Sequence, residues 1–224
     1  MPKGRFVTFE GGEGAGKSTQ VERLRQKLEE RGILVIATRE PGGSPRAERI
    51  RESLLSGEAK RFGPFAEALM FSAARMDHLD QTIRPALERG AFVLCDRFAD
   101  STRAYQGVLG EIDEGLVEEL ERTVVGQTRP DLTFILDVPA DVGLERASDR
   151  RGGEGADRFE AEDRSFHDRL RQAFLAIAER EPERCAVINA GADVNTVANE
   201  IWQIVEQRLL GPSADAMVGE AHAG

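Results

Sequence analysis

The chain of 224 residues is 40% hydrophobic and 31% charged, with 23 glycines and 9 prolines spread along it, which excludes a collagen helix, a coiled coil and wholesale disorder. Its 40 acidic residues outnumber its 30 basic ones and give a net charge of -10, which repels nucleic acid and anionic lipid, so we expect neither as a partner. The length predicts one domain over residues 1–210, followed by a small, polar, disordered tail over 211–224.

Short apolar runs alternate along the chain with longer segments of helical periodicity. The short runs are rich in β-branched and aromatic residues and are expected to form strands at 6–9, 34–37, 92–95, 133–138 and 186–188. Apolar residues recur at helical spacing in 18–31, 47–55, 64–89, 114–125, 160–179 and 194–210. Because parallel strands need crossover connections, this alternation predicts an α/β fold with a five-stranded parallel sheet flanked by helices on both faces.

The cysteines and the start of the chain favour a protein of the cytoplasm. Cys95 and Cys185 lie far apart without Cys-x-x-Cys spacing, so we expect free buried thiols and neither a disulfide nor a structural zinc site. No signal-peptide pattern precedes Phe6, and no uncharged run approaches the roughly 20 residues of a membrane span. We therefore expect no insertion into a membrane.

The first predicted strand leads into a glycine-rich stretch that matches G-x-x-x-x-G-K-[ST]. It comes between a strand and a helix, so its backbone N–H groups can surround a phosphate chain, and the helix N-terminus adds positive potential. Lys17 is expected to neutralise the β- and γ-phosphates and Ser18 to bind Mg²⁺. The predicted nucleoside triphosphate site consists of Gly11, Gly12, Glu13, Gly14, Ala15, Gly16, Lys17, Ser18 and Thr19.

Two acidic residues near this loop indicate further ligands. Glu13 would repel phosphates unless it faces a hydroxyl, a metal-bound water or an arginine, which indicates a second ligand; orientation toward solvent is the alternative. Asp96 ends the third strand, where P-loop enzymes place a carboxylate beside Mg²⁺, and Arg97 follows it. Because open α/β sheets bind ligands at the carboxyl ends of their strands, this pair predicts a metal contact next to a phosphate contact.

Residues 146–158 read RASDRRGGEGADR and depart from the alternation of strands and helices. Three glycines interrupt a cluster of arginines, which indicates a short mobile lid on the surface. A solvated loop with incidental charge is the alternative interpretation.

Four motifs in register resemble those of the thymidylate kinases (dTMP kinases), in the nucleoside monophosphate kinase group of P-loop proteins. They are FEGGEGAGKST at 9–19, TREPGG at 38–43, FSAAR at 71–75 and DRFADSTRAYQG at 96–107, and the resemblance covers about residues 5–210. It implies a homodimeric enzyme that phosphorylates dTMP to dTDP with ATP and Mg²⁺, in the pathway to dTTP. Another nucleoside monophosphate or a small alcohol as acceptor, and a nucleotide-dependent switch, are the alternatives.

The resemblance also implies roles on the acceptor side. Phe71 and Arg75, which share one helix face, would stack on thymine and contact its O4, while Thr102 and Gln106 would reach the base or its surroundings. Tyr105 would lie against the sugar, where a ribose 2′-hydroxyl would clash. Arg39 and Arg97 would hold the acceptor phosphate, and Glu13 would contact the 3′-hydroxyl region and the metal-bound water.

Three further details follow from comparison with the family pattern. The phosphate loop lacks an internal arginine, so a lid arginine would act on the transferring phosphate, with Arg150 and Arg158 as the candidates. Asn189–Asp193, after the last strand, is the candidate for the adenine pocket. Ser44, Asp77 and Arg103 depart from the usual residues of the family.

Overall fold

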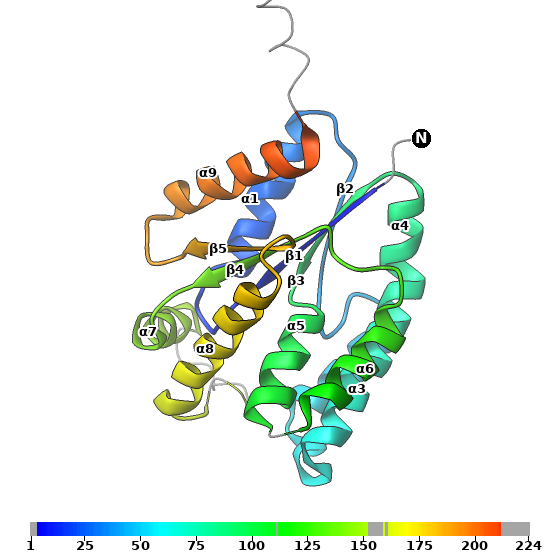
Figure 1. The fold of residues 1–224 in the computed structure, drawn as a ribbon, viewed down its shortest axis with the longest axis vertical. Coiled ribbons are helices and arrows are strands. Elements are labelled where there is room, and N and C mark those ends of the chain that lie inside the picture. Colours follow the sequence, from blue (N-terminus) through cyan, green and yellow to red (C-terminus); the bar gives the residue numbers. More distant parts are fainter. Residues whose placement is uncertain (1–3, 111, 152–158, 160, 212–224) are drawn as a thin grey trace, which may run out of the picture.

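A parallel sheet forms the centre of the molecule in the computed structural model, which describes residues 4–110, 112–151, 159 and 161–211. The five strands lie in the order β2-β3-β1-β4-β5 (Figure 1), and every neighbouring pair is parallel. Their bounds are Arg5–Glu10 (β1), Val35–Arg39 (β2), Phe92–Asp96 (β3), Leu132–Asp137 (β4) and Cys185–Asn189 (β5). The predicted α/β class and all five predicted strands are confirmed.

The helices connect these strands and cover the sheet on both sides (Figure 1). Their bounds are Lys17–Glu30 (α1), Pro45–Leu55 (α2), Gly63–His78 (α3), Arg84–Glu88 (α4), Ala99–Thr102 (α5), Glu114–Val125 (α6), Ala140–Arg151 (α7), Arg164–Arg180 (α8) and Val194–Val205 (α9). A 3-10 helix covers Glu58–Phe62, and wider π-helical turns cover Leu79–Ile83, Arg103–Leu109 and Glu206–Leu210.

The side chains of β1 divide between two cores because successive residues of a strand point to opposite faces. Val7 and Phe9 belong to the core that α1 and α9 cover. Phe6 belongs to the core on the other face, with Leu79, Ile83 and residues of α6. Each of these β1 side chains is almost completely buried and contributes roughly 1.5–3 kcal/mol of hydrophobic stabilisation.

The predicted helix at 64–89 is interrupted in the structure. Residues Leu79–Ile83 form a π-helical turn between α3 and α4, just before Pro85. Proline has no N–H group, and its ring clashes with the carbonyl four residues earlier, so the helix widens there. The predicted helix at 160–179 begins at Arg164, where the Asp163 side chain accepts a hydrogen bond from the Phe166 N–H group.

The lid predicted at 146–158 begins inside a helix, because residues 146–151 form the last turns of α7. Residues 152–158, which include Arg158, lie outside the described residues. The same is true of residues 212–224, which make up most of the predicted tail. The lid and the tail therefore stay predictions. No helix of the described part of the chain is long and apolar enough to cross a membrane.

Candidate active site

A cavity of about 380 Å³ lies at the carboxyl ends of β1, β2 and β3. It is lined by most of the residues that the sequence predicts for the site: Glu13, Gly14, Ala15, Gly16, Lys17, Ser18, Thr19, Arg39, Phe71, Arg75, Asp96, Arg97, Thr102, Tyr105, Gln106 and Arg150. Gly11 and Gly12 of the predicted set are not among its lining residues. The structure adds Glu40, Pro41, Arg51, Leu55, Phe98, Ser101 and Phe159 to the wall.

The glycine-rich loop joins β1 to α1 and holds Lys17 over its own backbone. The Lys17 ammonium is buried and donates to the carbonyls of Gly11 at 3.1 Å and Gly12 at 2.7 Å. Burial and the nearby Arg97 lower the pKa of Lys17 to about 8. Gly14 has a φ of 65°, and a Cβ atom there would lie 1.9 Å from the carbonyl oxygen of Gly143 in α7, so only glycine fits.

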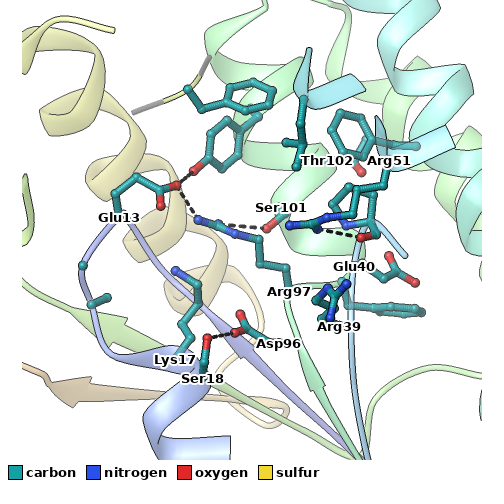
Figure 2. A pocket seen from close by; sticks show the side chains of 18 of the residues that line it. Glu13, Lys17, Ser18, Arg39, Glu40, Arg51, Asp96, Arg97, Ser101 and Thr102 are labelled. Carbon is teal, nitrogen blue, oxygen red and sulfur yellow. Dashed lines mark hydrogen bonds and ion pairs between the residues drawn. The ribbon is translucent and has the colours of Figure 1, made fainter. Parts of the chain in front are cut away.

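Ser18 and Asp96 meet on one side of this loop (Figure 2), where the Ser18 hydroxyl donates to the Asp96 carboxylate. Hydroxyl and carboxylate oxygens are the hard ligands that Mg²⁺ prefers, and this cation usually takes one or two protein carboxylates together with phosphates. Among the described residues, no group of three or more His, Cys, Asp and Glu side chains could hold a metal ion. By the chemistry of its two oxygen donors, the Ser18–Asp96 pair fits a Mg²⁺ ion whose other ligands are phosphate oxygens and water.

Glu13 points across the cavity toward Arg97 and not into solvent (Figure 2). Its Oε1 accepts from Arg97 Nη2 at 2.5 Å and from the Tyr105 hydroxyl at 2.9 Å. Burial alone would raise the pKa of Glu13, but the charges of Arg97 and Lys17 and the Tyr105 hydrogen bond outweigh it and lower the pKa to about 2. Glu13 is therefore an ionised acceptor at neutral pH, paired with an arginine as one of the sequence interpretations expected.

Arg97 reaches this position from a strained backbone. Its φ is 67°, and among the described residues it is the one non-glycine with a positive φ. This conformation costs of the order of 1–3 kcal/mol and persists only where the surroundings enforce it. The side chain also donates to the Gly11 carbonyl at 3.1 Å, so Arg97 links the third strand to the phosphate loop.

Arg75 is 1% exposed and lies between two buried carboxylates. Its Nε donates to Glu40 at 2.8 Å and its Nη1 to Glu121 at 2.6 Å. Its Nη2 donates to the Phe98 carbonyl at 3.2 Å and to the Thr102 hydroxyl at 3.0 Å. These contacts fix the guanidinium before any ligand binds, beside the half-buried Phe71 ring one turn earlier on α3.

The remaining predicted arginines differ in how they are held. Arg39 lines the cavity but pairs with Glu48 at 3.1 Å, and its side chain is 55% exposed. Arg150 lines the cavity from α7, while Arg146 donates to the carbonyl of Ala190 at 2.8 Å. The candidate adenine segment Asn189–Asp193 is not among the lining residues of the cavity, so no described contact supports that prediction.

The departures from the family pattern contact other residues in ways that preserve the site. Ser44 donates to Asp77 at 2.7 Å, so two of the unusual residues form one hydrogen bond. Arg103 pairs with Asp100 at 2.9 Å and with Glu181 at 2.6 Å, away from the cavity wall. None of the three replaces a predicted contact.

Several residues that hold this site were not singled out in the sequence. Glu40, Glu121 and Glu10 are buried acids whose partners lie far along the chain. Glu40 lies in the TREPGG motif, and a tight turn at its proline explains that motif without a buried partner for the acid. For Glu10 the available signal was an acid at the end of an otherwise apolar strand, a position that is costly unless hydrogen bonds compensate for burial.

Comparison with known proteins agrees with this geometry. A family model described as Thymidylate kinase matches residues 9–201. The chain is 54% identical to a thymidylate kinase of Nitrobacter hamburgensis, covering 98% of this chain and 95% of that protein, and 56% identical to one of Rhodopseudomonas palustris, covering 94% and 92%. A crystal structure of thymidylate kinase from Ehrlichia chaffeensis superposes with a TM-score of 0.73 at 36% identity, covering 92% of this chain and 100% of that one.

Proposed function

Because this chain belongs to the thymidylate kinase family, we propose that it transfers the γ-phosphoryl group of ATP to dTMP and releases dTDP. One observation carries the proposal. The phosphate loop with Lys17 and the Arg97–Glu13–Tyr105 cluster face the same cavity, and Phe71 and Arg75 also line it. Two nucleotides can therefore meet with their phosphates between Lys17 and Arg97.

The donor half holds the triphosphate of ATP. Backbone N–H groups from Glu13 to Thr19 and the N-terminus of α1 surround the phosphates, and Lys17 exchanges its carbonyl partners for phosphate oxygens. Ser18 and Asp96 would hold Mg²⁺, which supplies positive charge to the phosphate oxygens when bound. The resulting site recognises the charge and shape that all nucleoside triphosphates share.

The acceptor half selects thymidine monophosphate. The Phe71 ring offers a stacking surface for the pyrimidine, and Arg75, with Thr102 and Gln106 nearby, offers donors to its edge. Tyr105 and Glu13 face the sugar, where Glu13 accepts from the 3′-hydroxyl and the Tyr105 ring excludes a 2′-hydroxyl. Arg97 and Arg39 bind the 5′-phosphate, and Arg39 leaves its exposed partner Glu48 to do so.

The chemistry needs no general base. The attacking oxygen belongs to a phosphate whose second pKa is about 6, so it is already anionic near neutral pH. Catalysis then consists of holding the two phosphates in line and compensating the charge on the transferring group. Lys17, Arg97 and a lid arginine, Arg150 or Arg158, supply that charge, and closure of the lid excludes water and suppresses hydrolysis of ATP.

A homodimer and a cytoplasmic location complete the proposal. Phe65, Leu69 and Met76 lie along α3 with 43%, 45% and 53% of their surfaces exposed, although they are large and apolar. An exposed apolar stripe on a helix is typical of a protein interface, and a second copy of this chain can bury it. Light scattering on the wild type and on Leu69→Lys tests the dimer, since the charge should shift the mass toward the monomer.

The activity is tested with purified protein, ATP, Mg²⁺ and five acceptors: dTMP, dUMP, UMP, CMP and AMP. We expect dTDP to form from dTMP with the highest kcat/KM of the five, and little ATP hydrolysis without an acceptor. Turnover of a different acceptor with dTMP left unconverted contradicts the proposed substrate. Hydrolysis that is independent of any acceptor supports a nucleotide-dependent switch.

A further inference from the structure

We propose that Glu10 is a positioning residue of the acceptor half: its buried side chain caps α5 from the neighbouring strand and thereby fixes Arg97. The inference rests on the proposed function, because it concerns the binding of the dTMP phosphate. Glu10 does not line the cavity and so acts through other residues.

Helix α5 has no cap of its own. Phe98 occupies its N-cap position, and a phenyl ring cannot accept hydrogen bonds from the first N–H groups of a helix. Glu10, at the end of β1 and completely buried, supplies the missing acceptor. Its Oε1 accepts from the N–H groups of Phe98 at 2.7 Å and Ser101 at 3.3 Å, and its Oε2 accepts from the Ser101 hydroxyl at 2.6 Å.

The same contacts enclose the strained residue between strand and helix. The Arg97 N–H group donates to the carbonyl of Phe9 at 2.9 Å, and the next N–H group, that of Phe98, donates to Glu10. Two successive N–H groups of the turn are thus bound by two successive residues of β1. These two hydrogen bonds hold Arg97 at its positive φ. Without them, the turn would relax to a conformation of lower energy.

Glu10 also reaches the Arg97 side chain through one intermediate. The Ser101 hydroxyl, which donates to Glu10, lies 3.4 Å from Arg97 Nη1 and accepts from it. The helix that Glu10 caps continues into Thr102, Tyr105 and Gln106. A single buried side chain therefore fixes both the phosphate-binding arginine and the segment expected to face the nucleoside.

Burial and the nearby Asp100 raise the pKa of Glu10 to about 8, against the hydrogen bonds from Ser101 and Phe98, which lower it. Glu10→Gln keeps the shape and an acceptor, whereas Glu10→Ala removes the cap. The matched control is Thr8→Val, which removes a buried hydrogen bond from the same strand, between the Thr8 and Thr133 hydroxyls, and leaves every hydrogen bond of Glu10 in place.

The experiment measures kcat and KM for dTMP, together with ATP binding by calorimetry without dTMP. We expect Glu10→Ala to lower kcat/KM for dTMP by about 10-fold or more, because the turn that carries Arg97 loses its support, and to leave the Kd for ATP within about 2-fold. Glu10→Gln should restore most of the loss, and Thr8→Val should lower thermal stability without changing the dTMP kinetics. If Glu10→Ala does not fold, Ser101→Ala should show a smaller decrease in the same parameter.

The inference is overturned if Glu10→Ala weakens ATP and dTMP binding equally, or if neither Glu10→Ala nor Ser101→Ala changes the dTMP kinetics. It is also overturned if Thr8→Val reproduces the defect, since a general weakening of β1 would then explain it. Failure of the proposed function shows instead in the wild type, which would leave dTMP unconverted.

Discussion

The two halves of the cavity are built in opposite ways. The donor half is one contiguous stretch, from Glu13 to Thr19, whose backbone N–H groups we propose to bind a feature common to all nucleoside triphosphates. The acceptor half is assembled from side chains at the end of β2, on α3, in the turn after β3, on α5 and on the π-helical turn that follows α5, and α6 supports it with Glu121. Recognition of phosphate needs only a backbone shape, whereas recognition of one nucleoside needs side chains that are fixed in place.

Buried charge does this fixing on the acceptor side. Arg75 is held by Glu40 and Glu121, and Arg97 is held by Glu13. A buried ion pair adds little net stability compared with an apolar replacement, but losing one partner leaves a charge uncompensated. Loss of one partner in the acceptor half should therefore lower the stability of the fold, whereas loss of Lys17 in the donor half should mainly lower the activity.

The largest expected effect is on the stability of the acceptor half. Arg75→Met leaves Glu121 buried without its cation, while Glu40 keeps the neighbouring His78 ring as a partner. We expect the free energy of unfolding to fall by about 3–5 kcal/mol. The control is Arg39→Met, which removes an exposed pair with Glu48 and should cost about 0–1 kcal/mol. Urea denaturation of both variants measures the difference, and equal losses would contradict the contrast between a buried and an exposed arginine.

On the donor side, Lys17→Met should impair the reaction more than the fold. In the proposed reaction the ammonium compensates charge on the transferring phosphate, and removing one such group costs about 10²–10³-fold in kcat. The Gly11 carbonyl still accepts from Arg97 in this variant, so we expect the loss of the ammonium to cost the fold little. Steady-state kinetics and thermal melting measure the effects on activity and on stability separately. Normal turnover in Lys17→Met would show that Lys17 has no catalytic role.

Much of the fold was predictable because it rests on local signals. Apolar runs of β-branched and aromatic residues gave the five strands, and the glycine-rich loop was recognisable because its ligand contacts lie within nine consecutive positions. The interruption of the long helix before Pro85 was also a local signal, although the predicted helix ran through it.

The supports of the acceptor half were not predictable in the same way. Arg75 meets Glu40 and Glu121, which are 35 and 46 positions away, and such pairs leave no periodicity in a sequence. Each acid alone is typical of an exposed helix or a turn. Glu10 illustrates the same limit, because its role depends on a helix that begins 89 positions later, at Ala99.

The charge on Glu13 gives a pH-dependent test of the ion pair with Arg97, which joins the phosphate loop to the acceptor half. Its pKa is lowered from 4.5 to about 2, so its contribution to stability is fully present above pH 4.5 and is lost as the pH falls toward 2. We expect the stability difference between wild type and Glu13→Gln to shrink by about 3 kcal/mol over that range. Chemical denaturation at several pH values measures it, and a difference that does not vary with pH contradicts the pairing with Arg97.

The smallest expected effect concerns Tyr105. Tyr105→Phe removes the hydrogen bond to Glu13 but keeps the aromatic ring and the ion pair between Glu13 and Arg97. We therefore expect kcat/KM for dTMP to fall by an amount equivalent to about 1 kcal/mol of transition-state stabilisation. Selection against a ribose 2′-hydroxyl should survive in Tyr105→Phe and weaken in Tyr105→Ala. Competition between dTMP and its ribose counterpart checks this, and equal selectivity in both variants would exclude the ring as the selecting group.

The central claim, that two nucleotides meet with their phosphates between Lys17 and Arg97, can be measured with one compound. Adenosine and thymidine joined through five phosphates should occupy both halves at once and bind far more tightly than either substrate, because the second contact becomes intramolecular. Calorimetry should then show one molecule bound per chain, displaced by ATP and by dTMP alike. Displacement by only one of the two substrates would contradict the claim.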